Sequence, residues 1–444
     1  MIVAIDDTDS TNGMCTTYLA TKIIEELSEY DLVGMPRLVR LNPAVPWKTR
    51  GNGAIAFRLG KGRGKKRHIG MIAGRALYSY ENGVSWGDPS EIIRRCREVV
   101  AKWSKIDEGA SPGLIVTPKK PREIFYWDAV RGIVEKSLVE QELTRLGAFK
   151  YELAGGRGII GATAAAAWRP KDRTYEIITY RQEINWGKER LIDEATVKAL
   201  DHAFPSTFNN YDSDSGRIAI APHSPCPVLF GIRADDLEEL IPAMESIRGE
   251  RPESWIIYLT NQGTDDHIIV NWKSVEPNRS YAVEGNVASD PVTIKGGHVV
   301  FKLKPRRFPQ TIDCTAYEPS KGFRYVVRKL RPGDKVIVYG EMREEPRTLN
   351  LEKLKVLKLV EARKKVANPL CPNCGRHMKS AGSSAGYRCR RCGTKARVDE
   401  AEYSVAERGI REGWYEPPVC SRRHLSKPLK RLASKSLRKI QPVF

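Results

Sequence analysis

The stretch IVAIDDTDSTNGMCTTYLATKIIEELSE, residues 2–29, decides the fold of the N-terminal part of this chain. Its first four residues are apolar and predict a short buried strand, which stops at polar and acidic residues. Leu19, Ile23 and Leu27 then recur at helical spacing, so we expect a helix over residues 17–29. A strand followed by such a helix indicates an α/β unit, and the end of the strand is a common place for chemistry.

The sequence around this stretch continues the α/β pattern to about Tyr180. PRLVRLNP (36–43) and GAIAFRL (53–59) read as strands, and residues 91–103 and 129–146 have the periodicity of amphipathic helices. GKGRGKKRH (60–68) reads as a basic, glycine-rich loop.

Two units of different character follow. VLFGI (228–232), a helix over 235–247 and SWIIYLT (254–260) give half of a ferredoxin-like β-α-β arrangement, and the other half is not obvious. Residues 280–360 alternate in polarity and are interrupted by glycine and proline. This pattern predicts a five-stranded barrel of the OB type, a common oligonucleotide-binding scaffold.

Charge is unevenly distributed along the 444 residues. Lysine and arginine number 74 against 54 acidic residues, a net charge of +20. Residues 361–444 contain 20 basic and 7 acidic side chains, so 13 of the 20 net charges lie there. A basic C-terminal end favours a polyanionic partner, with nucleic acid ahead of a membrane surface.

The apolar stretches are short, and cysteines are few. Residues 158–168 and the proline-broken 218–232 are too short to cross a bilayer, and the acidic N-terminus is unlike a signal peptide. The chain has nine cysteines, four of them clustered. We therefore expect a cytoplasmic protein with a metal site and no membrane partner; its oligomeric state does not follow from the sequence.

The cluster consists of CPNC and CRRC, with fourteen residues between the two. Two such knuckles supply four thiolates for tetrahedral zinc, and a closed four-ligand shell is structural. Basic residues surround both knuckles, so the ribbon is expected to touch phosphates. The predicted zinc ligands are Cys371, Cys374, Cys389 and Cys392.

DDTDS, at the end of the first strand, is the second chemical signal. Asp6, Asp7 and Asp9 offer hard oxygen ligands suited to magnesium held between protein and phosphates. Thr16 and Thr17 lie at the start of the following helix, where free amides favour an anion. The same residues could instead cap the helix and form a turn, and spacing alone does not choose between the two.

PWKTRGNGA (46–54) and GGRGIIGA (155–162) form the third signal. Lys48, Arg50 and Arg157 supply positive charge, and the glycines permit close approach of backbone amides to a triphosphate. Neither string is a Walker motif, and GxGxxG is only loosely present. A helix-packing role for the second string stays open, although the neighbouring acids favour nucleotide binding.

Several of these strings together closely resemble one family, the archaeal isoleucine-tRNA agmatinylcytidine synthetases, over essentially the whole chain. The strings that carry the resemblance are VAIDDTDS (3–10), GMCTTYLA (13–20), PRLVRLNPAVPWKTRGNGA (36–54), GGRGIIGA (155–162) and PVLFGIR (227–233), followed by the barrel and the zinc ribbon.

The resemblance implies an α+β multidomain chain. We expect a kinase-like α/β catalytic domain over residues 1–195, interleaved with or followed by a ferredoxin-like domain (196–276). An OB-fold (277–362), a zinc ribbon (363–400) and a basic C-terminal tail (401–444) complete it. The resemblance further implies ATP-dependent conjugation of agmatine to the 2-carbonyl position of the wobble cytidine of isoleucine tRNA with a CAU anticodon. The modified anticodon would read AUA, and AMP and phosphate would be released.

A cytosine 2-carbonyl oxygen is a poor leaving group, so it needs activation, and phosphorylation converts it into departing phosphate. Thr16 matches the family's self-phosphorylated threonine, and Thr17 is the neighbouring alternative. The expected catalytic residues are Asp6, Asp7, Asp9, Thr16, Lys48 and Arg50. The expected nucleotide-binding residues are these aspartates, Lys48, Arg50, Gly156, Arg157 and Gly158, with the aspartates also holding magnesium.

Two further contacts are candidates on chemical grounds. Agmatine's guanidinium needs a carboxylate or an aromatic face, which Asp212 or Asp214 could supply; these two could also form a solvated turn. Arg306, Arg307 and Phe308 could hold the single-stranded RNA that a flipped base requires, or form an exposed loop without a partner.

Two functions of other classes remain as alternatives. A nucleic-acid ligase would require a K-x-D-G nucleophile, and KIDEG (105–109) has glutamate where the glycine belongs. A non-catalytic RNA-binding protein would not need three clustered acids, because carboxylates repel RNA unless a metal intervenes.

Overall fold

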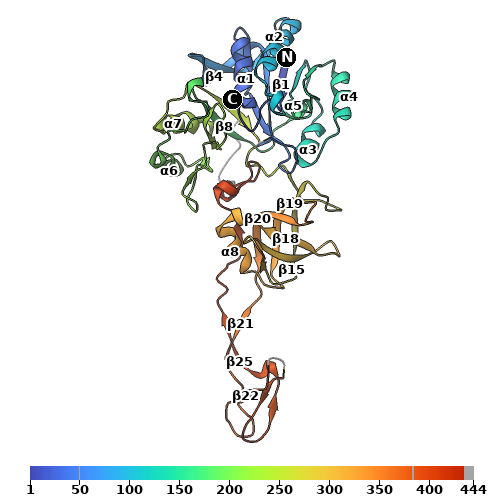
Figure 1. The fold of residues 1–444 in the computed structure, drawn as a ribbon, viewed down its shortest axis with the longest axis vertical. Coiled ribbons are helices and arrows are strands. Elements are labelled where there is room, and N and C mark those ends of the chain that lie inside the picture. The colour runs from blue at the N-terminus through green and yellow to red at the C-terminus, as the bar shows by residue number, and fades with distance from the viewer. Residues whose placement is uncertain (50, 383–384, 435–444) are drawn as a thin grey trace.

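The computed structural model describes residues 1–49, 51–382 and 385–434. Three bodies lie in a row along the long axis of the molecule (Figure 1). A large α+β body carries the N-terminus, a β-barrel follows, and a small cysteine-containing ribbon lies at the far end of a two-stranded stalk.

The large body is built on one mixed sheet of eleven strands. Nine strands follow the order β7-β6-β1-β4-β3-β13-β8-β12-β9, and β2 and β5 pair with β4 beside this path. The strands are β1 (Ile2–Asp6), β2 (Asp31–Val33), β3 (Arg37–Arg40), β4 (Gly53–Ile72), β5 (Arg75–Val84), β6 (Gly113–Thr117), β7 (Phe149–Glu152), β8 (Thr174–Tyr180), β9 (Thr207–Phe208), β12 (Val228–Ala234) and β13 (Ser254–Thr260).

Helices cover this sheet and bury its apolar residues in one continuous core. α5 is the most buried helix, because nine of its ten residues are shielded from solvent and its apolar residues lie all round its axis. The helices are α1 (Thr16–Glu26), α2 (Pro89–Trp103), α3 (Ile124–Arg131), α4 (Lys136–Leu146), α5 (Gly158–Ala167), α6 (Glu194–Ala203) and α7 (Leu240–Ser246).

The pairing of β3 with β13 joins the two halves of the sheet. These strands are parallel, with Leu259 opposite Arg37 and Thr260 opposite Leu38. β13 also pairs with the far end of β4, where Trp255 lies opposite Met71. The first 180 residues and the strand-helix-strand unit after residue 228 therefore share one sheet, and the boundary expected after residue 195 stays a prediction.

The strand and helix expected over residues 2–29 are confirmed as β1 and α1. The strands expected at 228–232 and 254–260 are confirmed as β12 and β13. The prediction of a loop at 60–68 is wrong, because β4 continues through these residues as one arm of a long hairpin with β5. Register shifts in this hairpin accommodate the glycines, and cross-strand pairing outweighs their low strand propensity.

The second body contains the predicted five-stranded barrel. The ring closes in the order β15-β17-β18-β20-β19, because β15 pairs with both β17 and β19. A short helix, α8 (Gly322–Arg328), lies between the third and fourth strands. The barrel strands are β15 (Arg279–Val287), β17 (Val299–Pro305), β18 (Ile312–Ala316), β19 (Lys335–Met342) and β20 (Leu349–Lys358).

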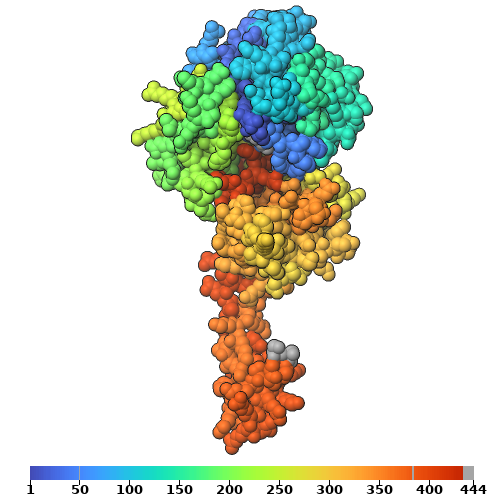
Figure 2. Space-filling model, viewed as in Figure 1, coloured from blue at the N-terminus to red at the C-terminus, as the bar shows by residue number. Residues whose placement is uncertain are grey.

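The chain then leaves the barrel and comes back. β21 (Ala362–Ala367) runs out and β25 (Glu402–Ala406) runs back beside it, forming the stalk of the ribbon. β26 (Gly413–Tyr415) rejoins the barrel by pairing with β20. Residues 416–434, here called the return segment, end in α9 (Leu429–Ser434) and fill the space between barrel and large body (Figure 2).

The return segment is fixed by charged contacts to both bodies. Arg431 pairs with Asp172 and Asp235 at 3.0 and 2.9 Å. Asp265 accepts hydrogen bonds from the Lys427 backbone and from the Lys353 side chain of the barrel. Residues assigned from the sequence to a basic tail thus connect the barrel to the sheet.

Among the residues that the structure describes, no helix has the length and apolar character needed to cross a membrane.

We predict that Gly113→Ala lowers stability. A methyl group there would lie 1.9 Å from the Ile159 backbone nitrogen, so α5 would be pushed away from β6. The expected cost is about 3 kcal/mol, or a fall in Tm of roughly 6–12 °C in a thermal unfolding scan. Gly132→Ala is the matched control, since its methyl group would meet its nearest neighbour at 3.5 Å. Equal Tm values for the two variants would contradict this packing.

Candidate active site and metal centre

A cavity of about 460 Å³ lies where the large body meets the return segment. Its first wall is the end of β1 with the starts of α1 and α5, and its second wall is formed by β8, β12 and the loop 218–224. The end of β3 and the start of β4 lie between these walls, and Arg422, Arg423 and His424 of the return segment close one side. The volume is sufficient for a nucleotide-sized ligand.

The three predicted aspartates line the first wall together. Burial, with the charge of Asp7 adding to it, raises the pKa of Asp6 well above its usual range. Burial also raises the pKa of Asp7, while Arg157, with a guanidinium nitrogen 3.5 Å from Asp7 Oδ2, opposes the shift. Burial and mutual repulsion make it unfavourable for neighbouring carboxylates to be ionised, so a bound cation would stabilise their charged form.

The backbone around these acids is unusual. Asp7 has a φ of 56° and Met14 a φ of 59°, in the left-handed region that non-glycine residues seldom adopt. The N-cap position of α1 is occupied by Cys15, so none of the three aspartates caps that helix. The helix-capping alternative is therefore not what the acids do.

Thr16 and Thr17 both line the cavity, but their hydroxyl groups have different neighbours. Thr16 Oγ1 lies 3.1 Å from Thr8 Oγ1 and 3.5 Å from Asp9 Oδ1. Thr17 Oγ1 lies 3.0 Å from the Cys15 sulfur. The Thr16 hydroxyl is thus the one beside the acids.

The glycines of the 155–162 string have two structural roles, in a turn and in close helix packing. Gly156 has a φ of 60° in the turn before α5 and is not part of the cavity wall, whereas Gly158 is. A methyl group at Gly161 would lie 1.8 Å from Asp6 Oδ2, so this glycine lets α5 approach the acid directly. Close helix packing, left open by the sequence, is therefore present.

Two of the three predicted basic residues belong to the wall of the cavity. Lys48 and Arg157 both line it, and the Lys48 ammonium donates to the Pro43 carbonyl. Arg50 lies outside the described residues. The Trp47 ring, 47% exposed and 5.5 Å from the Arg157 guanidinium carbon, adds an aromatic face that the sequence analysis missed.

Charged side chains in the middle and on the second wall were also missed. Arg40 at the end of β3, Glu176 on β8 and Arg233 on β12 all line the cavity. Arg233 Nε donates to Glu176 Oε1 at 2.9 Å. A charged residue ending the apolar run PRLVR could have flagged Arg40, but the partners come from strands more than 130 residues away.

The predicted agmatine contacts Asp212 and Asp214 do not line the cavity. Asp212 is buried; its Oδ1 accepts from the Asp214 backbone and its Oδ2 from the Cys420 backbone, both at 3.1 Å. Asp212 therefore anchors the return segment. Its contact with the Asp214 backbone forms a turn, but this turn is not solvated at Asp212.

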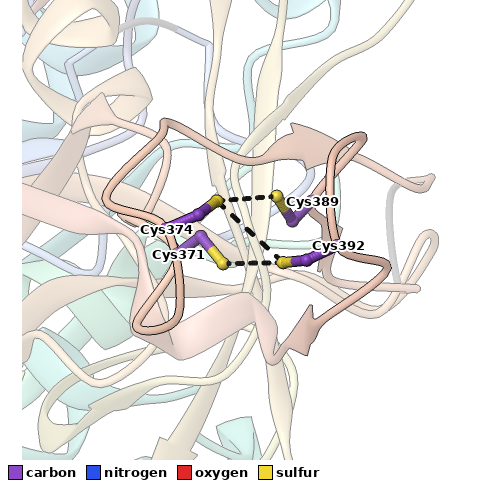
Figure 3. A group of neighbouring side chains, drawn as sticks. All are labelled: Cys371, Cys374, Cys389 and Cys392. Atoms are coloured by element: carbon purple, nitrogen blue, oxygen red, sulfur yellow. Dashed lines mark hydrogen bonds between the residues drawn. The ribbon is translucent and has the colours of Figure 1, made fainter.

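The four cysteines of the ribbon converge on one point (Figure 3). Their sulfur atoms all lie within 4.8 Å of one another, with separations of 3.3 Å for Cys371–Cys392 and 3.4 Å for Cys374–Cys389. Tetrahedral zinc with Zn–S bonds of about 2.3 Å needs sulfurs about 3.8 Å apart. The small apolar core around them could not hold this fold alone, so the cluster fits a structural zinc.

Within the described chain, these cysteines are the one group that brings three or more metal-ligating atoms together. Asp6, Asp7 and Asp9 share a wall of the cavity but do not converge in that way. A cation at the aspartates would need further ligands, which phosphate oxygens supply readily.

Comparison with known proteins gives consistent matches along the chain. The family model of the TiaS TCKD domain matches residues 2–155, and that of the TiaS FLD domain matches residues 156–267. The model of the TiaS C-terminal zinc ribbon domain matches residues 368–410.

Individual relatives match over nearly their whole length. The tRNA(Ile2) 2-agmatinylcytidine synthetase TiaS of Methanocaldococcus jannaschii is 42% identical, covering 97% of this chain and 98% of the relative. The crystal structure of a TiaS–tRNA(Ile2)–ATP complex has a TM-score of 0.83 at 38% identity, covering 97% of each chain. A TiaS–tRNA(Ile2)–AMPCPP–agmatine complex has a TM-score of 0.81 at 34% identity, covering 97% and 96%.

We predict that Cys371→Ser combined with Cys374→Ser removes the metal. Two hydroxyl groups cannot replace two thiolates on zinc, so zinc content measured by mass spectrometry should fall from about one per chain to near zero. Cys420→Ser, outside the ribbon, should leave it unchanged. Retention of zinc by the double variant would contradict the assignment of these ligands.

Proposed function

The chain belongs to the tRNA(Ile2) 2-agmatinylcytidine synthetase (TiaS) family, and we propose that the cavity beside β1 is where it attaches agmatine to the wobble cytidine of tRNA(Ile2) at the expense of ATP. The observation that carries this function is the match over 97% of the chain to two crystallised relatives. One was crystallised with tRNA(Ile2) and ATP, and the other with tRNA(Ile2), AMPCPP and agmatine. The tRNA, ATP and agmatine are thus its substrates.

We propose four functional units in the order that the sequence indicates. The first is a kinase-like catalytic unit and the second a ferredoxin-like unit, which supply the two walls of the cavity. The barrel is proposed to be an OB-fold, because its strands close in the order first, second, third, fifth, fourth and a helix precedes the fourth. The ribbon is the fourth unit.

The proposed chemistry begins with activation of the base. The C2 carbonyl oxygen of cytosine forms a bond to the γ-phosphorus of ATP as the bond from that phosphorus to the ADP oxygen breaks, which turns a poor leaving group into a good one. Hydrolysis of this ADP to AMP and a second phosphate completes the proposed set of products. The primary amine of agmatine then forms a bond to C2, and the C2–O bond breaks to release phosphate. Without activation, the amine would have to displace an oxide-like oxygen, which does not leave at neutral pH.

The first wall is proposed to hold the triphosphate. Asp6, Asp7 and Asp9 would bind magnesium, which would neutralise phosphate charge when present. Arg157 and Lys48, with Gly158 at the start of α5, would contact the phosphate oxygens. We also propose Arg50 and Gly156 as contacts of the triphosphate, as the sequence predicts.

Thr16 is proposed as the self-phosphorylated residue. Its hydroxyl lies among Thr8 and Asp9 at the start of α1, close to where the proposed magnesium would bring the γ-phosphate. A phosphate there would also meet the amides at the N-terminus of the helix, a favourable place for an anion.

The tRNA is proposed to lie along the length of the molecule. The stalk holds the basic ribbon far from the cavity, so a wobble base in the cavity and a second part of the tRNA at the ribbon could be bound together (Figure 1). Arg306, Arg307 and Phe308 in the barrel are proposed contacts, with Phe308 packed edge-on against Trp272.

Nucleoside analysis tests the proposed reaction. A tRNA(Ile2) transcript incubated with the protein, ATP, magnesium and agmatine should yield a wobble cytidine heavier by agmatine minus water. Omitting agmatine is the control. An unshifted cytidine in the complete mixture would contradict the function.

We predict that Asp7→Asn reduces the rate of agmatinylation roughly 100-fold or more, because a charge beside the transferring phosphate is lost while the side-chain shape is kept. Affinity for tRNA should change little. Asp107→Asn, at an exposed position in the short 3₁₀ helix Ile106–Glu108 outside the cavity, is the matched control. Undiminished single-turnover rates in Asp7→Asn would remove this residue from the proposed metal site.

A further inference from the structure

Arg40 is a buried guanidinium whose donors are poorly satisfied. Its side chain is 15% exposed, and its Nε is buried without a hydrogen-bond partner. In the described part of the chain, its one side-chain hydrogen bond runs from Nη1 to the Gly51 carbonyl at 3.5 Å, and Nη2 lies 3.8 Å from Glu176 Oε2. Desolvating a guanidinium whose five N–H donors have so few and such distant partners is costly, so the site favours an anionic ligand.

A comparison within the same chain shows how a fully paired arginine looks. The Arg181 guanidinium, more deeply buried, donates from Nε to Glu250 at 2.9 Å. Its two terminal nitrogens reach the carbonyls of Lys188 and Glu189 at 2.7 and 2.9 Å. Arg324 and Arg408 also have a buried Nε without a partner, but their terminal nitrogens lie 3.2 and 2.6 Å from carboxylate oxygens of Glu318 and Asp334. Arg40 differs from these arginines in its weakly paired terminal nitrogens.

The nearest carboxylate does not neutralise Arg40. Glu176 Oε1 accepts from Arg233 Nε at 2.9 Å, and Glu176 Oε2 accepts from the Gln262 side-chain amide. The two arginines and one glutamate leave one unit of positive charge facing the cavity. A chain that placed this charge only for stability would have paired it more closely.

His424 adds no negative charge to balance the excess. Its Nδ1 lies 3.0 Å from Gln262 Oε1, which can only accept, so the imidazole donates to that oxygen. The charge of Arg40, followed by burial and Arg233, holds the pKa of His424 well below its usual range. His424 is thus a neutral group beside the two arginines. Arg422 and Arg423 of the same segment also line the cavity and pair with Glu416 and Glu341.

The sheet sets the position of Arg40 relative to the acids. β1 and β3 are both antiparallel to β4, so they run parallel and their C-terminal ends lie at one edge. Arg40 lies opposite Gly53, and the row continues across β4 to the position just after Asp6. Two strand spacings, about 10 Å, separate the backbones of Arg40 and Asp7, a gap that an arginine side chain and one phosphate group can fill.

From this geometry we infer that Arg40, assisted by Arg233, is a phosphate subsite distinct from the proposed triphosphate site, and that it holds the phosphate carried by the activated cytosine and released from it. This inference rests on the proposed function. The bound group leaves as the agmatine nitrogen bonds to C2 and the C2–O bond breaks; one amine proton departs with the oxygen, giving HPO₄²⁻. The guanidinium stabilises the charge that collects on that phosphate.

Binding of inorganic phosphate to the full-length protein tests the subsite. Calorimetric titration is done with AMPCPP and magnesium present, so that the triphosphate site is filled. Wild type should show saturable binding, and Arg40→Gln should weaken it roughly 10- to 100-fold, the range expected for losing charge-assisted hydrogen bonds. Arg94→Gln, which removes the same charge from an exposed position on α2, is the matched control and should bind as wild type does.

Kinetics separate this role from contact with the tRNA backbone, the other source of a phosphate group. For departing phosphate, Arg40→Gln lowers the single-turnover rate, keeps its tRNA affinity and loses product inhibition by phosphate. For a backbone phosphodiester, the tRNA affinity would fall instead, and that result would overturn the assignment. Arg40→Lys, which keeps the charge but not the fork of donors, should lie between the two and decides the question if Arg40→Gln does not fold.

Different results would overturn the phosphate subsite and the proposed function. Phosphate binding that is absent in wild type or unchanged in Arg40→Gln overturns the subsite even if agmatinylcytidine is formed. Absence of agmatinylcytidine with wild type overturns the proposed function, while the phosphate titration still reports on Arg40.

Discussion

The parallel pairing of β3 with β13 is the constraint on which the site depends. It joins strands from the first 72 residues to strands from residues 174–260, so that both walls of the cavity stand on one sheet. The ends of β1 and β3 then lie at the same edge, which brings the acids and Arg40 to one place. The return segment completes this edge through Arg431 and Lys427, fixed to Asp172, Asp235 and Asp265.

No ion pair among the described residues joins Asp6 or Asp7 to Arg40 or Arg233 across the cavity. Asp6 and Asp7 lie on one wall with pKa values raised by burial, and Arg40 and Arg233 lie across from them with one carboxylate between two guanidinium groups. Direct ion pairs between these aspartates and arginines would neutralise both groups, and a charged ligand would then gain little by binding. In the arrangement that we propose, a cation at the acids and phosphate at the arginines would stabilise charge that appears only during the reaction.

Local features of this fold could be predicted from the sequence, and long-range ones could not. The Cys371–Cys392 cluster and the strand-helix unit at the N-terminus depend on short spacings, which the sequence displays directly. Arg40 gains its role from strand order, and His424 reaches the cavity by a chain that first passes through barrel and ribbon, so neither has a local signature. Residues 60–68 were wrongly expected to form a loop because their glycines obscure a strand that pairing with β5 stabilises.

The most direct test of the central claim, phosphoryl activation of the wobble carbonyl, follows the oxygen atom. A tRNA(Ile2) carrying ¹⁸O at the C2 carbonyl of its wobble cytidine is converted with ATP and agmatine, and the products are analysed by mass spectrometry. Phosphoryl activation predicts ¹⁸O in inorganic phosphate and none in AMP. Recovery of ¹⁸O in AMP would mean that the base is activated by adenylyl transfer, and would contradict the account.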